Sequence, residues 1–294
     1  TFSWTPRSRA DIVTKDTISD ALRTVLTREG LTHQGMVASD VDALMQPVNL
    51  DSSQAGRNDD SETAFYSTYV LFFLMYFVIM LYGMNVARSI IEEKTSRVFE
   101  VLLATIRPEE MMAGKVIGVG SVGLTQVGIW LFTALLLTST PLVSELTGSN
   151  THIALTGMQV VFFVIFFLLG YLLYSAVAAA LGAMTNSEQE LQQLNMFLVL
   201  PLAFCMFSLT VVIPNPDGMA ATVLSLFPFF APLLMYLRIS MGHPSALQIG
   251  LSITLMVATI YAVLWVASRI YRVGILMYGK KPSLPEILRW LRYS

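Results

Sequence analysis

Apolar residues gather into long segments that carry no charged side chain and alternate with short polar segments. No charge occurs between Lys115 and Glu145, between Glu145 and Glu188, or between Arg238 and Arg269. A helix needs about 20 apolar residues to cross the hydrocarbon core of a bilayer. The pattern therefore predicts an all-α polytopic membrane protein with five spanning helices. The predicted spans are residues 65–86, 116–138, 158–182, 194–213 and 247–267.

A sixth apolar stretch, residues 219–237, is long enough to cross but contains Pro228 and Pro232. Basic residues concentrate in segment 87–115 and in the C-terminal tail, and the positive-inside rule places both in the cytoplasm. An even number of crossings must then separate these two segments, and four crossings satisfy this condition whereas five do not. We therefore expect a re-entrant or interfacial helical hairpin on the outer side, within residues 214–246.

The same parity places residues 1–64 outside the membrane. This segment is polar, with ten acidic and six basic residues, as expected of an extracytoplasmic domain. It begins with Thr1 and has neither an apolar signal core nor a cleavage site, so we expect a fragment that lacks a first span. The predicted organisation is an extracytoplasmic remnant over 1–64, a transmembrane domain over 65–275 and a cytosolic tail over 276–294.

Composition and charge argue against several classes of function. Only 13% of the 294 residues are charged, against about a quarter in soluble domains. The net charge of −2 argues against a nucleic-acid partner, which usually requires a basic face. The single cysteine, Cys205, and the scattered His33, His152 and His243 form no ligand cluster. We therefore expect neither a metal site nor a cofactor in this chain.

The polar segment 87–115 carries a helical pattern of its own. Ile91 and Leu102 share one face of the expected helix over 88–104, while Glu93 and Arg97 share the other. Pro108 ends this helix, since the residue before a proline is pushed out of the helical region. An amphipathic helix with mixed charge can dock its apolar face on a partner protein.

This segment closely resembles the cytosolic loop of type-2 ABC exporter permeases, in the branch of the sodium-exporter permease NatB. The order of spans and the outer hairpin are also similar to that branch. The residues that carry the resemblance are Glu92, Glu93, Lys94, Arg97, Glu100, Leu102, Leu103, Thr105, Pro108, Gly114 and Lys115.

The resemblance implies that the loop is a coupling helix, which sits in a cleft of a separate ATP-binding cassette ATPase subunit. That partner would bind ATP and Mg, and a second permease copy or homologous half would complete the exporter in a cell membrane, for example a bacterial inner membrane. The implied coupling residues are Glu92, Glu93, Lys94, Arg97, Glu100, Leu102, Leu103, Arg107 and Pro108.

Other interpretations remain open at this stage. The loop helix could instead lie on lipid headgroups. The chain could be a membrane-embedded enzyme or a membrane-anchored sensor, although the candidate nucleophiles Ser175 and Thr125 have no histidine or acidic residue near them in sequence. Gln126 and Asn195 are the polar candidates for a transport pathway. Sodium, a drug, a lipid or a peptide would each fit as substrate.

Overall fold

The computed structural model describes residues 3–4, 22, 51–52, 58–96, 105–139 and 157–274. Apart from one pair of two-residue strands, the elements in these ranges are helices. The strands β1 (Ser3–Trp4) and β2 (Asp51–Ser52) run parallel, with Ser3 opposite Asp51 and Trp4 opposite Ser52. Most of segment 1–64, the loop residues 97–104 and the tail 276–294 lie outside the described residues, so the predictions for them stay predictions.

Within the residues that the structure describes, five helical segments are long and apolar enough to cross a membrane. This confirms the prediction of an all-helical, multi-pass membrane protein. They are α3 (Asn58–Thr95), α5 (Pro108–Ser139), α7 (Gly157–Met184), α8 (Glu188–Leu194) together with α9 (Met196–Val212), and α12 (Ala246–Gly274).

The first span extends further than its apolar pattern suggested. The sequence placed its end at Val86 and began a separate amphipathic helix at Arg88, whereas α3 continues without interruption to Thr95. Neither glycine nor proline occurs between these positions, and Ile90 and Ile91 remain buried in the bundle. The span and the first part of the loop helix are therefore one rigid element.

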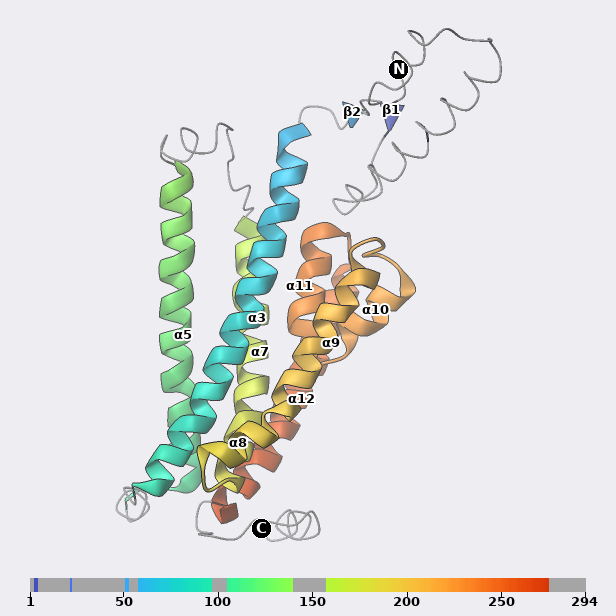
Figure 1. The fold of residues 1–294 in the computed structure, drawn as a ribbon. Coiled ribbons are helices and arrows are strands. Elements are labelled where there is room, and N and C mark those ends of the chain that lie inside the picture. Colours follow the sequence, from blue (N-terminus) through green and yellow to red (C-terminus); the bar gives the residue numbers. More distant parts are fainter. Residues whose placement is uncertain are drawn as a thin grey trace, which may run out of the picture.

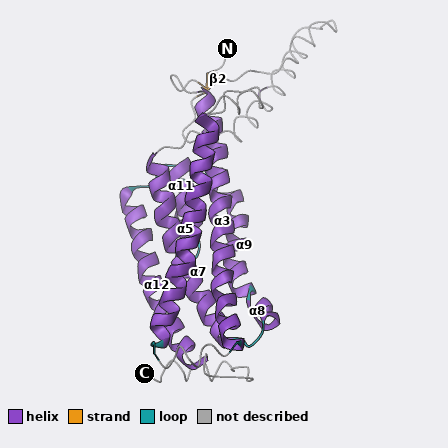
Figure 2. Cartoon of the chain, turned by 90° about the vertical axis from the view of Figure 1, so that its left-hand side faces the viewer, coloured by secondary structure: helices purple, strands orange, loops and turns teal. Residues whose placement is uncertain are grey.

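Helix α7 forms the centre of the bundle and packs against α3, α11 and α12 (Figures 1 and 2). Its first half contributes large buried aromatic side chains, including Phe163, Phe166 and Phe167. Its second half contributes small buried ones, which let neighbouring backbones approach closely. At Gly182 a Cβ atom would lie 2.8 Å from the carbonyl oxygen of Ala87, so only glycine fits this crossing of α3 and α7.

The apolar stretch 219–237 does not form one long helix. It contains α10 (Met219–Leu226) and the start of α11 (Ala231–Met241), joined by a turn over 227–230. Both lie at the end of the bundle where α9 ends and α12 begins (Figure 1). Pro232 stands in the first turn of α11, where its missing N–H has no intrahelical partner to lose. The placement of this helix pair on the outer side of a membrane stays a prediction.

Candidate functional site

The end of α3 and the start of α5 flank the predicted coupling loop at the end of the bundle that also bears α8 (Figure 1). Glu92 and Arg107 are exposed there, Glu93 is half-buried, and Pro108 is the first residue of α5. The other predicted coupling residues, Arg97, Glu100, Leu102 and Leu103, lie outside the described residues.

Lys94 occupies a different environment from its neighbours in sequence. Its side chain is only 3% exposed, and its Nζ donates to three main-chain carbonyls. The acceptors are Ala183 at 3.0 Å, Thr185 at 3.2 Å and Gly274 at 2.8 Å. All three lie at or just beyond the C-terminal ends of α7 and α12, where carbonyls lack intrahelical partners and the helix dipole favours a cation. Lys94 therefore caps two helices from a third.

A second contact connects α3 with α5. Lys115 forms an ion pair with Glu93 at 2.8 Å and donates to the carbonyl of Ser89 at 2.7 Å. The side chains of Lys115 and Glu93 are 11% and 33% exposed, and the Glu93 carboxylate oxygen that pairs with Lys115 is itself buried. The ion pair holds the first turns of α5 against the last turns of α3.

A third contact connects α5 with α12, through an ion pair between Glu109 and Arg272. The two side chains are 33% and 53% exposed, and exposed pairs of this kind contribute little to stability. In the same first turn of α5, the Glu110 carboxylate accepts from the backbone N–H of Arg107 at 3.2 Å. This acidic residue in the first turn helps to fix where α5 begins.

The turn between α7 and α9 completes this end of the bundle. The Ser187 hydroxyl accepts from the backbone N–H of Glu190, whose carboxylate accepts from the backbone N–H of Asn186. This reciprocal arrangement resembles a capping box and fixes the start of α8. It also places the Glu190 carboxylate close enough to Lys94 to act on it electrostatically.

The two pathway candidates do not come together. Gln126 is half-buried in the middle of α5, whereas Asn195 stands at the junction of α8 and α9, near the loop end. The backbone of Asn195 continues the helical hydrogen bonding, since its N–H donates to Leu191 and its carbonyl accepts from Leu198 and Val199. The structure therefore assigns them no common site.

The opposite end of the bundle contains a polar cluster that the sequence did not suggest. Its centre is Arg238 of α11, which is 1% exposed. Nε donates to the carbonyl of Pro216 at 2.6 Å, and Nη1 donates to the Ser225 hydroxyl at 2.8 Å. Nη2 donates to the Thr222 hydroxyl at 3.0 Å and to the Gln248 amide oxygen at 3.1 Å. One guanidinium thus joins the turn before α10, α10 itself, α11 and the start of α12.

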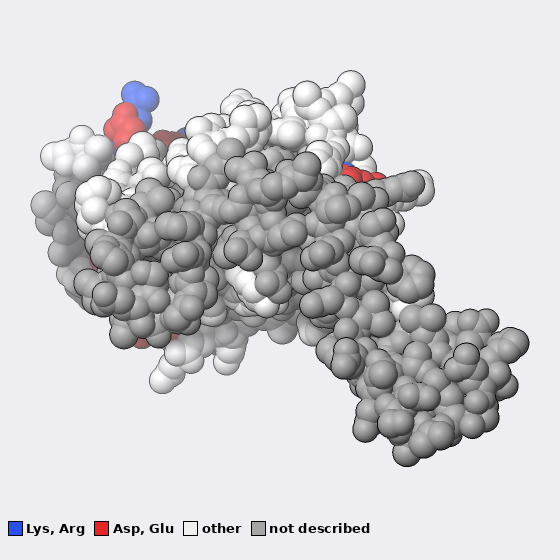
Figure 3. All heavy atoms as spheres, turned by 90° about the horizontal axis from the view of Figure 1, so that it is seen from above, with Lys and Arg blue, Asp and Glu red and all other residues white. Residues whose placement is uncertain are grey.

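Asp217 and Gly242 reinforce this cluster. The Asp217 carboxylate accepts from the backbone N–H of His243 at 3.0 Å, which closes the turn after α11. A Cβ atom at Gly242 would lie 2.8 Å from the Asp217 carboxylate, so a side chain at this position would displace that carboxylate. Burial lowers the pKa of the Arg238 guanidinium, and the nearby Asp217 carboxylate opposes that shift. In the view from above, uncharged residues predominate among the described atoms that are visible, and charged side chains appear only at the margins (Figure 3).

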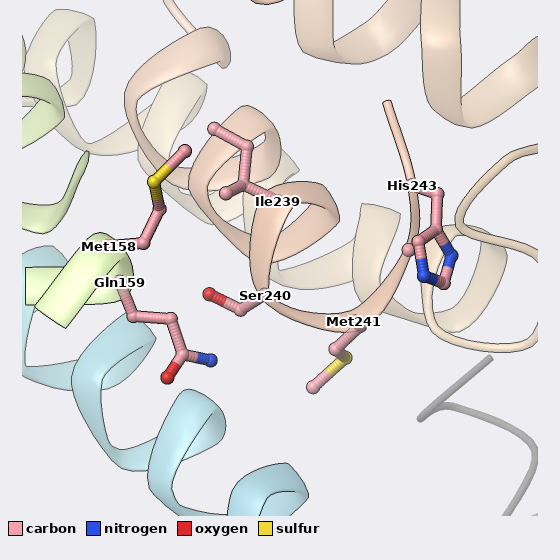
Figure 4. A pocket seen from close by; sticks show the side chains of 7 residues that line it. Met158, Gln159, Ile239, Ser240, Met241 and His243 are labelled. Atoms are coloured by element: carbon pink, nitrogen blue, oxygen red, sulfur yellow. The ribbon is translucent and has the colours of Figure 1, made fainter. Parts of the chain in front are cut away.

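A cavity of about 220 Å³ lies beside this cluster, between the first turn of α7 and the end of α11 (Figure 4). Its wall includes Met158, Gln159, Met241 and His243. Their side chains point in different directions and do not converge on one point (Figure 4). Among the residues that the structure describes, no group of histidine, cysteine or acidic side chains could hold a metal ion.

The sequence matches a family of known proteins. The family model described as "ABC-2 family transporter protein" matches residues 7–269. The chain belongs to this family. The ABC-2 membership and the five apolar helices together make it a multi-pass membrane protein of a transporter family.

Two curated relatives of this ABC-2 protein are similar over most of the chain. The uncharacterized protein YhaP of Bacillus subtilis is 32% identical over 299 residues, which cover 97% of this chain and 70% of YhaP. The uncharacterized protein MJ1024 of Methanocaldococcus jannaschii is 28% identical over 250 residues, which cover 84% of this chain and 59% of MJ1024. No solved structure matches the chain significantly.

The sequence of this ABC-2 protein predicted the burial of neither Lys94 nor Arg238. A signal for Lys94 existed, because Ala87, Ile90, Ile91 and Lys94 follow helical spacing and all four are buried. Lys94 therefore continues the apolar face of α3 and does not belong to its charged face. Arg238 stands out in the sequence because it is the one basic residue between the two proline-containing turns and the last span. Its hydrogen-bond acceptors could not be predicted, because they come from three other elements.

Proposed function

We propose that this chain is the permease subunit of an ATP-driven exporter in a cell membrane, and that it couples to a separate ATPase through the segment between α3 and α5. The ABC-2 family and the five apolar helices support a role as the membrane-spanning part of a transporter. The partner ATPase would bind ATP and Mg, and a second permease copy or homologous half would complete the pathway.

One observation carries the coupling part of this proposal. The helix ends on either side of residues 97–104 expose charged side chains, namely Glu92, Arg107 and Glu110. The same helix ends are fastened to other helices by Lys94, Lys115 and Glu109. Exposed charges steer and orient a protein partner. Helix ends that are attached to other helices would transmit the motion of that partner to the bundle. A loop that only rested on lipid headgroups would need no such attachment to the bundle.

The proposal is tested by asking which proteins bind the full-length permease. Affinity purification from native membranes is expected to recover an ATP-binding cassette ATPase with the wild-type protein. The charge reversals Glu92→Lys and Arg107→Glu are expected to reduce that recovery, since both side chains are exposed at the loop end. Asn215→Lys is the matched control, because Asn215 is exposed at the opposite end.

Two results would contradict the proposal. If no ATPase is recovered with the wild-type protein, the proposed ATPase partner is contradicted. Equal recovery with the wild-type protein and the doubly reversed variant would remove the charged loop end from the interface.

The substrate belongs to one of four classes that fit an apolar helical bundle: sodium, a drug, a lipid or a peptide. Gln126 and Asn195 are proposed as polar positions along the pathway. Because these two residues lie at different depths of the bundle, each would contact the substrate at a different stage. Replacement of either residue by alanine is expected to change transport of the substrate without changing recovery of the ATPase.

A further inference from the structure

At the loop end, described side chains connect the helices at three places, which we call joints. The three joints differ in their exposure to water. Lys115 with Glu93 connects α3 to α5, and Arg272 with Glu109 connects α12 to α5. Lys94 connects α3 to both α7 and α12. Arg272 and Glu109 are 53% and 33% exposed, whereas Lys115 is only 11% exposed and Lys94 only 3%.

This difference decides which joint resists separation. When an exposed ion pair opens, water replaces the lost partner, so the opening costs little free energy. When the Lys94 joint opens, an ammonium group loses three acceptors inside the protein, where no solvent compensates it. The carbonyls of Ala183, Thr185 and Gly274 would also lose their donor. The Lys94 joint should therefore stay closed while the exposed ion pair between Arg272 and Glu109 opens and closes.

The packing around Lys94 supports the same conclusion. A Cβ atom at Gly182 would lie 2.8 Å from the backbone oxygen of Ala87, which shows how closely α7 approaches α3. A Cβ atom at Gly274 would lie 2.7 Å from the backbone oxygen of Ala183, which shows the same for α12 and α7. The three helix ends meet backbone to backbone, with the lysine ammonium at the junction.

We propose that Lys94 is the positioning residue that makes the ends of α3, α7 and α12 move as one body when the coupling loop moves. Lys94 stands one residue before the last residue of α3 and three before the loop residues 97–104. A displacement of the loop then carries α7 and α12 with it, through the three main-chain carbonyls that Lys94 holds. Lys94 acts through helix ends and contacts no ATPase.

This inference rests on the proposed coupling to an ATPase, and hydrogen exchange of the purified full-length complex tests it. Exchange is compared without nucleotide and with ATP plus vanadate, in peptides covering residues 105–110 and the ends of α7 and α12. In the wild-type complex, nucleotide is expected to change exchange in all of these peptides. In Lys94→Met, the change in 105–110 should persist while the change at the ends of α7 and α12 is lost.

The matched control is Arg88→Met, which removes an exposed cation from the same helix and should behave as wild type. Gly274→Ala disturbs the same joint without altering Lys94, because its methyl group would meet the Ala183 carbonyl. Gly274→Ala should also abolish the nucleotide-dependent change in hydrogen exchange at the ends of α7 and α12. It therefore tests the inference even if Lys94→Met fails to assemble. ATP turnover should continue in both joint variants, which a general loss of structure would not allow.

The outcomes separate the inference from the proposed function. A nucleotide-dependent change at α7 and α12 that persists in both Lys94→Met and Gly274→Ala would overturn the role of Lys94 and leave the coupling proposal intact. A wild-type change confined to 105–110 would do the same. A wild-type complex without any nucleotide-dependent change, or without an ATPase, would overturn both.

Discussion

Arg238 should be a large single contributor to the stability of the helix pair α10 and α11. The variant Arg238→Met keeps a long side chain but removes the guanidinium and its four hydrogen bonds. Hydrogen bonds to charged groups contribute about 1.5–3 kcal/mol each when one partner is removed, and such values do not add fully. Because the acceptors at Pro216 and Ser225 stay buried, we expect the free energy of unfolding to fall by about 3–5 kcal/mol.

The variant Arg238→Lys separates charge from geometry. An ammonium keeps the positive charge near Asp217, but it lacks the planar fork that reaches four acceptors on three other elements. We therefore expect a stability between those of wild type and Arg238→Met. The matched control is Arg88→Met, an exposed arginine whose loss should change the free energy of unfolding by no more than about 0.5 kcal/mol.

The assay is reversible unfolding of the purified protein in mixed micelles, followed by tryptophan fluorescence, with thermal unfolding as a second measurement. A loss of this size should also lower the melting temperature by about 5 °C or more. An Arg238→Met protein that unfolds within about 0.5 kcal/mol of wild type would refute the reasoning. That result would mean that the four acceptors find other partners and that Arg238 does not organise this end of the bundle.

Three further predictions concern packing, orientation and assembly. Gly182→Ala should destabilise the bundle by about 1–3 kcal/mol because its methyl group meets the Ala87 backbone, whereas Gly128→Ala on α5 has open space and should be neutral or stabilising; comparable losses in unfolding assays would contradict this. In a Cys205→Ala background, Asn215→Cys should react with an impermeant thiol reagent from outside intact cells and Ser96→Cys only after the cells are opened; the reverse pattern would invert the predicted orientation. Among loop-end charges, Glu92→Lys should reduce co-purification of an ATPase while Glu188→Lys on α8 should reduce it less, and an equal effect would place the interface across the whole end of the bundle.

The five spans could be predicted from the sequence because long uncharged segments have few alternatives to crossing a membrane. The break in 219–237 could also be predicted, since Pro228 and Pro232 each disfavour one uninterrupted helix. The end of the first span was wrong by nine residues. Polar residues begin at Arg88, but the helix depends on backbone hydrogen bonds and on burial of Ile90 and Ile91, which continue beyond that point.

The candidate site was less predictable than the fold. Lys94 follows two glutamates and was grouped with them as a coupling residue, yet the structure buries it against carbonyls 89 to 180 positions further along the chain. Main-chain carbonyls carry no sequence signal, because every residue has one. Arg238 presents the same difficulty, since its acceptors are a carbonyl, two hydroxyls and an amide that come together only in the folded protein.

Transport itself tests the central claim most directly. Inside-out membrane vesicles that contain the full-length permease and its ATPase would be compared with vesicles from a strain lacking the permease, with sodium, a drug, a labelled lipid and a peptide as probes. The account predicts that one probe accumulates only with the permease and ATP, and that vanadate abolishes the accumulation. Equal accumulation of every probe in both kinds of vesicle, while the complex still hydrolyses ATP, would contradict it.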